Sequence, residues 1–227
     1  MQEVELKAKI VAAITSDGHL QLDNRRGVIS FYSKHLKEVN SFNKTFTTLF
    51  GVGGKVHHDE SGGNLRYKLY IPNKKSAIDL ATLGTPIGNK TKINFSIPSW
   101  IRDGSSKIKS IYLRMLFDCE GSIYLQDDGR WRLKFKMAKD ESLIDNGIDF
   151  MKEVKELLEE FDVETSNVLI NEGNIRKDGS KSLFMIMEIK GCSFINFLKY
   201  VGFDNSLKRM KLEKAINSMG RSQELLL

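Results

Sequence analysis

The stretch KSIYLRMLFDCEGSIYL, residues 109–125, decides how the sequence folds. It has the pattern of an apolar helix that runs into a strand, with Asp118 and Glu120 immediately before Gly121. A helix C-terminus is the negative end of the helix dipole, so each carboxylate there is unfavourable by a few tenths to about 1 kcal/mol. The position of these acids therefore needs an explanation outside the helix itself.

An earlier stretch, KIVAAITSDGHLQL at residues 9–22, repeats this pattern. Asp17 and Glu120 are 103 residues apart, close to half of the 227-residue chain. After each acid the sequence predicts the same order of elements: a hairpin, an amphipathic helix, a second hairpin and a short helix. The predicted fold is α+β, with two αββαββα halves related by pseudo-two-fold symmetry and one antiparallel sheet in each half. The predicted halves are residues 1–95 and 106–227, joined by a linker at 96–105.

The composition is that of an ordinary globular protein with an excess of basic residues. Hydrophobic residues make up 41% of the chain and charged residues 28%, and the net charge is +6. No run approaches the roughly 18 apolar residues that cross a bilayer, and the N-terminus lacks a signal-peptide pattern. Two cysteines give no disulfide framework. We expect an intracellular protein, in the cytoplasm or nucleoid of a prokaryote or in an organelle, that is not secreted and has no membrane partner.

The two repeated helices are apolar around most of their circumference, which is typical of buried helices. If they pack together as the repeat suggests, Asp17 and Glu120 meet at one end, where two carboxylates repel each other. A divalent cation offsets this repulsion, and such ions are often held by one or two carboxylates with waters and substrate phosphates. A solvated helix end explains either acid alone. Their recurrence at equivalent positions favours a metal site.

The segments IVAAITSDG (10–18) and LRMLFDCEG (113–121) resemble the two LAGLIDADG motifs of single-chain homing endonucleases. The resemblance extends over nearly the whole chain through the repeated order of elements. It implies a monomer in which the two motif helices form the central interface and the two sheets form a saddle over DNA. It also implies that Asp17 and Glu120 bind Mg²⁺, assisted by the main-chain oxygens of Ser16 and Cys119. Mn²⁺ is expected to substitute, and Ca²⁺ to bind without supporting efficient cleavage.

The first half departs from the family pattern at two positions, Thr15 and Tyr32. Thr15 replaces the earlier Asp of the motif in the first copy, so Asp118 in the second copy is expected to be structural. Members of this family also carry a basic residue at the end of the second strand of each half. Lys139 fits that position in the second half, whereas the first half has Tyr32 there and Lys34 close by. Lys139 and Lys34 are therefore candidate catalytic residues, although either could be a plain surface charge.

Strand alternation indicates where DNA would lie. In RWRLKFKM, residues 130–137, the basic residues share one face and the apolar residues share the other. Basic side chains and a two-stranded ribbon suit the phosphates and the major groove of DNA. Each half would cover about one helical turn, which gives a loosely palindromic target of roughly 20 base pairs. The candidate DNA-contacting residues are Arg25, Arg26, Tyr32, Arg66, Lys68, Tyr70, Arg130, Arg132, Lys134, Lys136, Arg176 and Lys177.

The predicted activity is site-specific, Mg²⁺-dependent hydrolysis of double-stranded DNA. The resemblance implies an intron-encoded enzyme. The termini lack the Cys/Ser and His-Asn residues of a protein-splicing element, so we expect a free-standing protein. One alternative is an RNA-binding intron maturase on the same fold, with weak or no cleavage. Another is a DNA-binding regulator, for which the two acids would be unnecessary.

Overall fold

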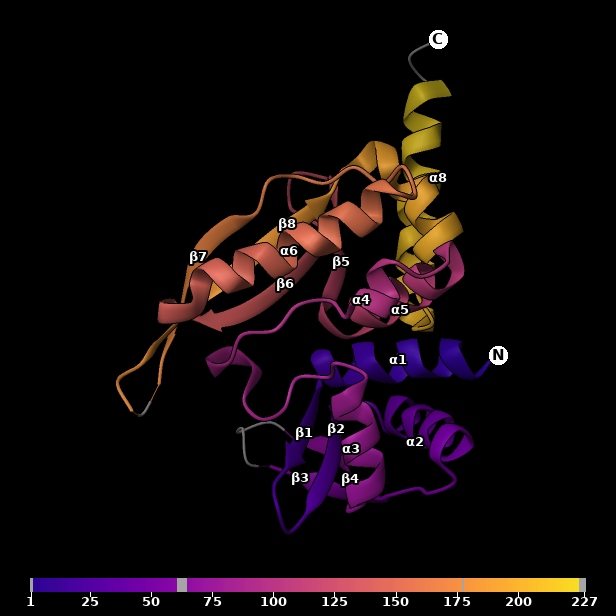
Figure 1. Ribbon diagram of the computed structural model, residues 1–227. Coiled ribbons are helices and arrows are strands. Elements are labelled where there is room, and N and C mark those ends of the chain that lie inside the picture. The colour runs from indigo at the N-terminus through magenta and orange to yellow at the C-terminus, as the bar shows by residue number, and fades with distance from the viewer. Residues whose placement is uncertain (1, 61–64, 177, 225–227) are drawn as a thin grey trace. The chain divides into compact units, whose positions relative to one another are not determined.

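The computed structural model describes residues 2–60, 65–176 and 178–224, with side chains up to Met219. The chain forms two compact units, Met1–Tyr112 and Leu113–Leu227. Figure 1 labels their helices and strands. Each unit has one four-stranded antiparallel sheet. The predicted order, helix, hairpin, helix, hairpin, helix, is confirmed in both. No helix in the described part of the chain is long and apolar enough to span a membrane.

Unit 1 has the sheet order β1-β2-β4-β3. Three aromatic or aliphatic residues of α2, Val39, Phe42 and Phe46, are buried. The Phe42 ring stacks on Phe31 of β2 with a centroid distance of 4.5 Å, so the amphipathic face of α2 covers this sheet. The elements are α1 (Glu3–Thr15), β1 (Gly18–Leu22), β2 (Gly27–Ser33), α2 (Leu36–Phe50), β3 (Lys55–Asp59), β4 (Arg66–Ile71), α3 (Lys74–Thr82), η1 (Lys90–Lys92), α4 (Ser99–Arg102) and the start of α5 (Ser106–Glu120).

The segment after α3 covers the free edge of β1. Ile87 forms a parallel bridge with Leu20, and the Gly88 main-chain nitrogen donates to the Leu20 oxygen at 2.7 Å. The segment predicted as a linker, 96–105, contains α4, and its Ile101 side chain is fully buried. The two units divide inside α5, between residues 112 and 113.

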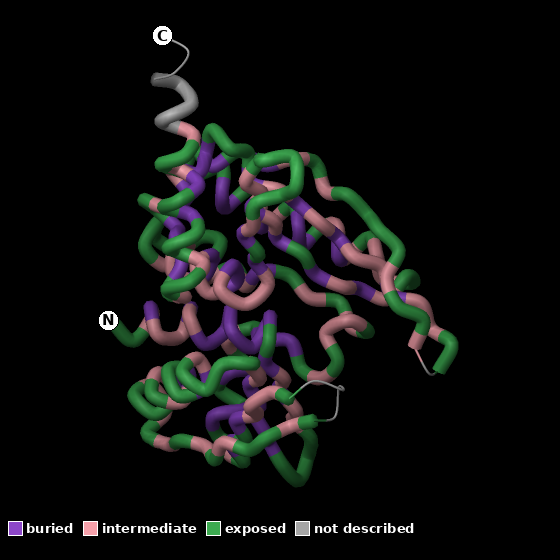
Figure 2. Tube along the Cα trace, turned by 180° about the vertical axis from the view of Figure 1, so that it is seen from behind, coloured by how far each residue is buried: buried purple, intermediate pink, exposed green. Residues whose placement is uncertain are grey.

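Unit 2 has the same topology, β5-β6-β8-β7. The buried residues of α6 include Phe150, Met151 and Val154, and α6 contacts β6 and β8; Figure 2 shows the buried stretches along these elements. The last helix, α8, has no equivalent in unit 1, and it contacts β5. The elements are β5 (Gly121–Leu125), β6 (Trp131–Asp140), η2 (Glu141–Leu143), α6 (Ile144–Glu159), β7 (Leu169–Ile175), β8 (Lys181–Ile189), η3 (Gly191–Ser193), α7 (Phe194–Asn196), η4 (Phe197–Val201) and α8 (Ser206–Glu224).

Candidate metal site and nucleic-acid interface

Each predicted metal-binding acid lies where a helix passes almost directly into a strand. Asp17 precedes Gly18, the first residue of β1, and Glu120 ends α5 and precedes Gly121, the first residue of β5. A Cβ on Gly18 would lie 2.6 Å from the Cα atom four residues earlier, and a Cβ on Gly121 would lie 2.4 Å from the main-chain oxygen four residues earlier. A side chain does not fit at either position. The glycine therefore allows the sharp junction that presents the acid.

A lysine ammonium lies at the end of α1. Lys90 of η1 donates from Nζ to the main-chain oxygens of Ile14 (2.8 Å) and Gly18 (2.7 Å), and also to that of Ser16. A positive charge is favourable at this negative end of the helix dipole. Lys90 is half-buried, so these hydrogen bonds hold its charge within one residue of Asp17 along the chain.

A second lysine occupies the corresponding place in unit 2. Lys208 of α8 donates from Nζ to the main-chain oxygens of Asp118 (2.5 Å) and Phe117 (3.3 Å). Phe117 is the position equivalent to Ile14 in the repeat. Lys90 and Lys208 thus perform the same local function from elements that are not equivalent. Sequence reasoning missed both lysines, because they follow their acids by different intervals, 73 and 88 residues.

Asp118 has the structural role that the sequence predicted. Its carboxylate accepts hydrogen bonds from the main-chain nitrogens of Asp204 and Asn205, both at 3.0 Å, just before α8. Burial raises the pKa of Asp118 to about 6, although these hydrogen bonds act in the opposite direction. Asp118 therefore connects the end of α5 to the start of the helix that carries Lys208.

The chemistry of the two acids fits a hard divalent cation. Asp17 is exposed and Glu120 is half-buried, and both offer carboxylate oxygens. The main-chain oxygen of Ser16 already accepts a hydrogen bond from Lys90, which disfavours it as a ligand because an ammonium and a cation repel each other. Cys119 is half-buried, and its assistance stays a prediction. Among the described residues no group of three or more His, Cys, Asp and Glu side chains forms a preassembled metal cluster.

The structure does not bring Lys139 to the Glu120 junction. Phe135 of β6 pairs with Gly121, and Lys139 lies four residues farther along the strand, roughly 13 Å away. Its side chain is 1% exposed, and a Cβ on Gly147 of α6 would lie 3.2 Å from the Lys139 Cβ. Burial lowers the pKa of Lys139 to about 8. Lys34 is exposed just beyond β2, and the catalytic role of both lysines stays a prediction.

The outer face of the unit 2 sheet has the alternation that the sequence predicted. Leu133 and Phe135 are fully buried, whereas Lys136 is exposed and Arg132 and Lys134 are half-buried on the opposite face. The face is not purely basic, because one carboxylate of β8, Glu188, lies 3.1 Å from Lys134 Nζ and 3.4 Å from Arg132 Nη1. A hydrogen bond to Tyr124 and the Glu188 carboxylate both raise the pKa of Lys134. Arg130, at the turn before β6, is exposed.

The outer face of the unit 1 sheet groups cations around an aromatic ring. Arg66 Cζ lies 4.6 Å from the centroid of the Tyr32 ring, and Lys68 Nζ lies 5.6 Å from it. Lys68 Nζ also lies 5.8 Å from the centroid of the Tyr70 ring. Arg66 pairs with Asp59 at 2.8 Å. Four predicted DNA-contacting residues of β2 and β4 therefore share one surface.

The predicted arginines at the β1–β2 turn are exposed. Asp23 accepts hydrogen bonds from the main-chain nitrogens of Arg25 (2.8 Å) and Arg26 (2.9 Å), and it also pairs with the Arg26 side chain. Lys74 of α3 donates to the Asn24 oxygen at 2.7 Å. These contacts fix the turn and leave both arginine side chains at the surface.

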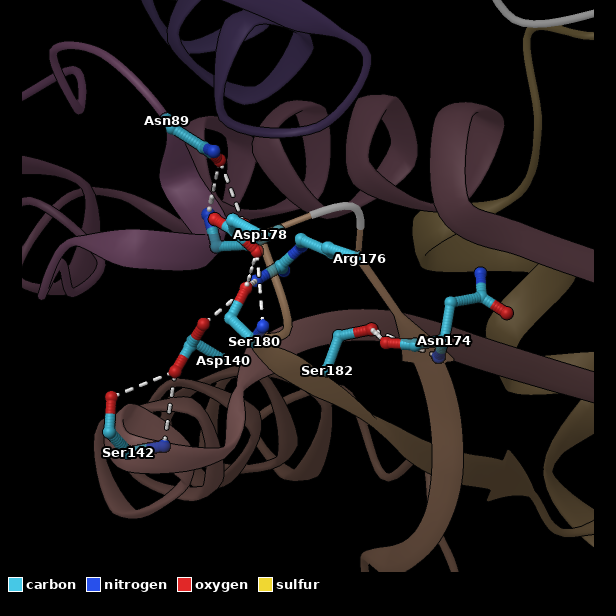
Figure 3. Close-up of polar contacts among 9 residues, drawn as sticks. Asn89, Asp140, Ser142, Asn174, Arg176, Asp178, Ser180 and Ser182 are labelled. Carbon is cyan, nitrogen blue, oxygen red and sulfur yellow. Dashed lines mark hydrogen bonds and ion pairs between the residues drawn. The ribbon is translucent and has the colours of Figure 1, made fainter.

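Arg176 is held within unit 2 by a polar network, which Figure 3 shows. Its Nη1 lies 2.7 Å from Asp140 Oδ2 and 3.2 Å from Ser180 Oγ. Hydrogen bonds from Ser142 and from Arg176 hold the pKa of Asp140 below its usual value. Arg176 thus ties the β7–β8 hairpin to the end of β6. Lys177, predicted to contact DNA beside it, lies outside the described residues.

The comparison with protein families identifies the repeated motif. Residues 107–202 match the model of the LAGLIDADG-like domain. The second repeat, residues 107–202, is therefore similar to a LAGLIDADG-like domain. Its fold is similar to that of the homing endonuclease I-DmoI, with a TM-score of 0.60 and 14% identity, over 94% of this chain and 100% of that one. The homing endonuclease I-WcaI, bound to its DNA recognition sequence, gives a TM-score of 0.54 and 12% identity, over 93% of this chain and 86% of that one. At these identities the likeness establishes the fold.

Curated relatives of this chain are much longer proteins. The DNA-directed RNA polymerase subunit Rpo1N of Methanocaldococcus jannaschii is 30% identical over 205 residues, which are 83% of this chain and 15% of that protein. The tRNA-splicing ligase RtcB of Pyrococcus furiosus is 28% identical over 217 residues, which are 89% of this chain and 21% of that protein. The chain thus spans about a fifth or less of the length of these two relatives.

Proposed function

We propose that this chain is a site-specific double-strand DNA endonuclease that hydrolyses phosphodiester bonds with the help of Mg²⁺. The observation that carries the proposal is the repeated junction of acid and glycine with a lysine ammonium at the same helix end. Asp17 has Lys90 near it in unit 1, and Glu120 has Lys208 near it in unit 2. A protein that only binds DNA does not need the two acids, whereas a metal-dependent nuclease does.

The proposed roles follow from the contacts at each junction. Asp17 and Glu120 would each bind a divalent cation together with waters and phosphate oxygens. A bound divalent cation would activate a water and stabilise charge on the phosphate. Lys90 and Lys208, whose Nζ atoms are held by main-chain oxygens, would contribute a fixed positive charge that attracts the DNA phosphates and would not bind the cation themselves. We propose these two lysines as the basic residues of the site in preference to Lys34 and Lys139.

The outer sheet faces support DNA as the substrate. Their exposed cations suit phosphate contacts, which position a protein on a duplex, and two four-stranded sheets suit a target of roughly 20 base pairs. Structures similar to this chain were solved with DNA and Mn, with target DNA and Mg, and with DNA and Ca. We therefore also propose a monomer that uses divalent cations, with Mg²⁺ or Mn²⁺ supporting cleavage and Ca²⁺ supporting binding.

The relatives favour the interpretation that the shared segment is genetically mobile, that is, that it is inserted into different genes. They carry four different names, an RNA polymerase subunit, a replication factor C subunit, an RNA ligase and an aminotransferase. The matching segment covers only 9 to 21% of these proteins. We infer that it is an insert in unrelated hosts and carries none of their named activities. Insertion into many hosts is what a homing endonuclease promotes, whereas an intron as the host of this chain stays a prediction.

The test is cleavage of a DNA target selected from a randomised pool in the presence of Mg²⁺. Asp17→Asn and Glu120→Gln are each expected to reduce cleavage by about 100-fold or more, while binding measured in Ca²⁺ stays within a few-fold of wild type. Asp79→Asn, at an exposed acid of α3, is the matched control and should cleave normally. Unchanged cleavage by the first two variants would refute the assignment. Splicing activity on an intron RNA without DNA cleavage would favour the maturase alternative.

A further inference from the structure

Three strands of unit 2 contribute a row of side chains to the outer face of the sheet. The register pairs Lys136 of β6 with Ile186 of β8, and Ile186 with Leu169 of β7. Directly opposite residues share a face, with Cβ atoms roughly 4.5–5.5 Å apart. The neighbours of Ile186 in sequence, Met185 and Met187, are 2% and 0% exposed. The row therefore lies on the side of the sheet away from the core.

This row puts an aliphatic pair on a surface that also carries basic side chains and the Phe184 ring. The Leu169 side chain is 56% exposed, and Ile186 is half-buried. Next to them Lys136 Nζ lies 3.6 Å from the centroid of the Phe184 ring, and Lys134 precedes Lys136 on the same face. Core packing does not explain these exposed aliphatic groups, and phosphate binding does not need them.

The equivalent row of unit 1 has different chemistry. In each unit the row begins one residue after the strand residue that pairs with the motif glycine. In unit 1 that row consists of Tyr32, Lys68 and His57. Unit 1 therefore presents a phenol, an ammonium and an imidazole where unit 2 presents an ammonium and two aliphatic side chains. The two units cannot recognise the same sequence through these positions.

We propose that Leu169 and Ile186 contact the C5-methyl groups of thymine and make unit 2 specific for thymine at these positions of its half of the target. The inference rests on the proposed DNA binding. Thymine is the base that presents a methyl group in the major groove, and apolar side chains are the groups that recognise it. The flanking ammonium group of Lys136 matches a phosphate beside such a base, whereas that of Lys134 lies 3.1 Å from the Glu188 carboxylate. The charge of Lys136 favours DNA over an apolar protein partner as the occupant of this surface.

The experiment compares thymine with deoxyuridine, which lacks the methyl group. The full chain selects a target from a randomised pool in Ca²⁺, and each thymine of that target is then replaced in turn. Wild type is expected to bind about fourfold more weakly when a contacted methyl is removed, the fold-change that corresponds to about 0.8 kcal/mol per buried methyl. The effect should be confined to roughly one to three thymines in one half of the target.

Two variants connect the effect to these side chains. In the double variant Leu169→Ser, Ile186→Ser, which leaves no methyl group on either side chain, thymine and deoxyuridine should be bound equally at those positions. Ile170→Ser is the matched control, since Ile170 is 47% exposed on the same strand but pairs with Met185 on the opposite face of the sheet. It should retain the fourfold difference, and a thermal melt of each variant checks folding.

Each other outcome has a defined meaning. Equal binding of thymine and deoxyuridine duplexes by wild type would overturn the inference and leave the proposed endonuclease standing, as would a difference that persists in the double variant. Self-association of wild type that Leu169→Ser abolishes, without any thymine effect, would assign the surface to a second copy of the chain. A chain that selects no DNA would refute the proposed function, and the inference with it.

Discussion

Replacing Lys139 by methionine is expected to stabilise the protein, and the size of the effect follows from burial. The Lys139 side chain is 1% exposed, and burial lowers its pKa from 10.5 to about 8. One pKa unit corresponds to about 1.4 kcal/mol, so keeping this lysine charged in the folded protein costs about 3 kcal/mol at pH 7. Methionine keeps the unbranched stem without the ammonium. Because polar contacts of the ammonium are lost as well, Lys139→Met should raise the free energy of unfolding by about 1–3 kcal/mol.

The stability that Lys139→Met gains over wild type should become smaller as the pH rises. Below pH 8 the lysine is charged in both the folded and the unfolded state, and the full penalty of burial applies. Between pH 8 and 10.5 the folded state releases the proton while the unfolded state keeps it, so the stability of wild type rises with pH. Urea unfolding at pH 7 and at pH 10 should therefore show a large difference between variant and wild type at pH 7 and a smaller one at pH 10.

The control lies on the opposite face of the same strand. Lys136→Met replaces an exposed lysine, and its effect on stability should stay within about 0.5 kcal/mol at both pH values. A loss of more than about 1 kcal/mol in Lys139→Met, or a difference that does not change with pH, would refute the reasoning. Cleavage by Lys139→Met should stay within a few-fold of wild type. A large loss of cleavage with intact folding would instead support the catalytic role predicted from the sequence.

Two further predictions concern the end of α5. The pKa of Asp118 is raised from 3.8 to about 6, so its contribution to stability, about 3 kcal/mol, is present below pH 3.8 and lost as the pH rises through 6. The melting temperature of wild type should fall between pH 4 and 7 more steeply than that of Asp118→Asn, and parallel curves would contradict this. Gly121→Ala should lower the free energy of unfolding by about 1–3 kcal/mol, because its Cβ would lie 2.4 Å from the Phe117 oxygen. Urea unfolding measures the effect, and wild-type stability would show that the backbone shifts freely.

The order of elements could be predicted from the sequence because it is encoded locally. The 3.6-residue and two-residue periods of apolar residues, together with the glycine after each acid, were enough to find both αββαββα halves. The alternation along residues 130–137 also placed the basic face of β6 correctly. The same alternation puts Lys139 in step with Leu133 and Phe135, on the buried face. The family pattern suggested a catalytic role for Lys139, whereas its own strand period already indicated burial.

The contacts of the candidate site depend on tertiary structure and could not be predicted in the same way. Lys90 reaches residues more than 70 positions earlier, and Lys208 reaches residues about 90 positions earlier. Arg176 is bound to Asp140 across 36 residues, which no local pattern indicates. Periodicity assigns a side chain to a face, but only the packing of distant elements determines which polar group it meets there.

The bridge between Ile87 and Leu20 has a consequence for any attempt to separate the two repeats. A fragment cut after α3, where the repeated elements end, would leave the main-chain donors and acceptors of β1 uncovered, and such edges invite strand pairing between molecules. It would also lack Lys90. In unit 2 the strand beside the junction, β5, is contacted by α8, which carries Lys208. A fragment that keeps one repeat intact should therefore include the seven elements and the segment that follows them. That segment carries the lysine in both units, and in unit 1 it also covers the edge of β1.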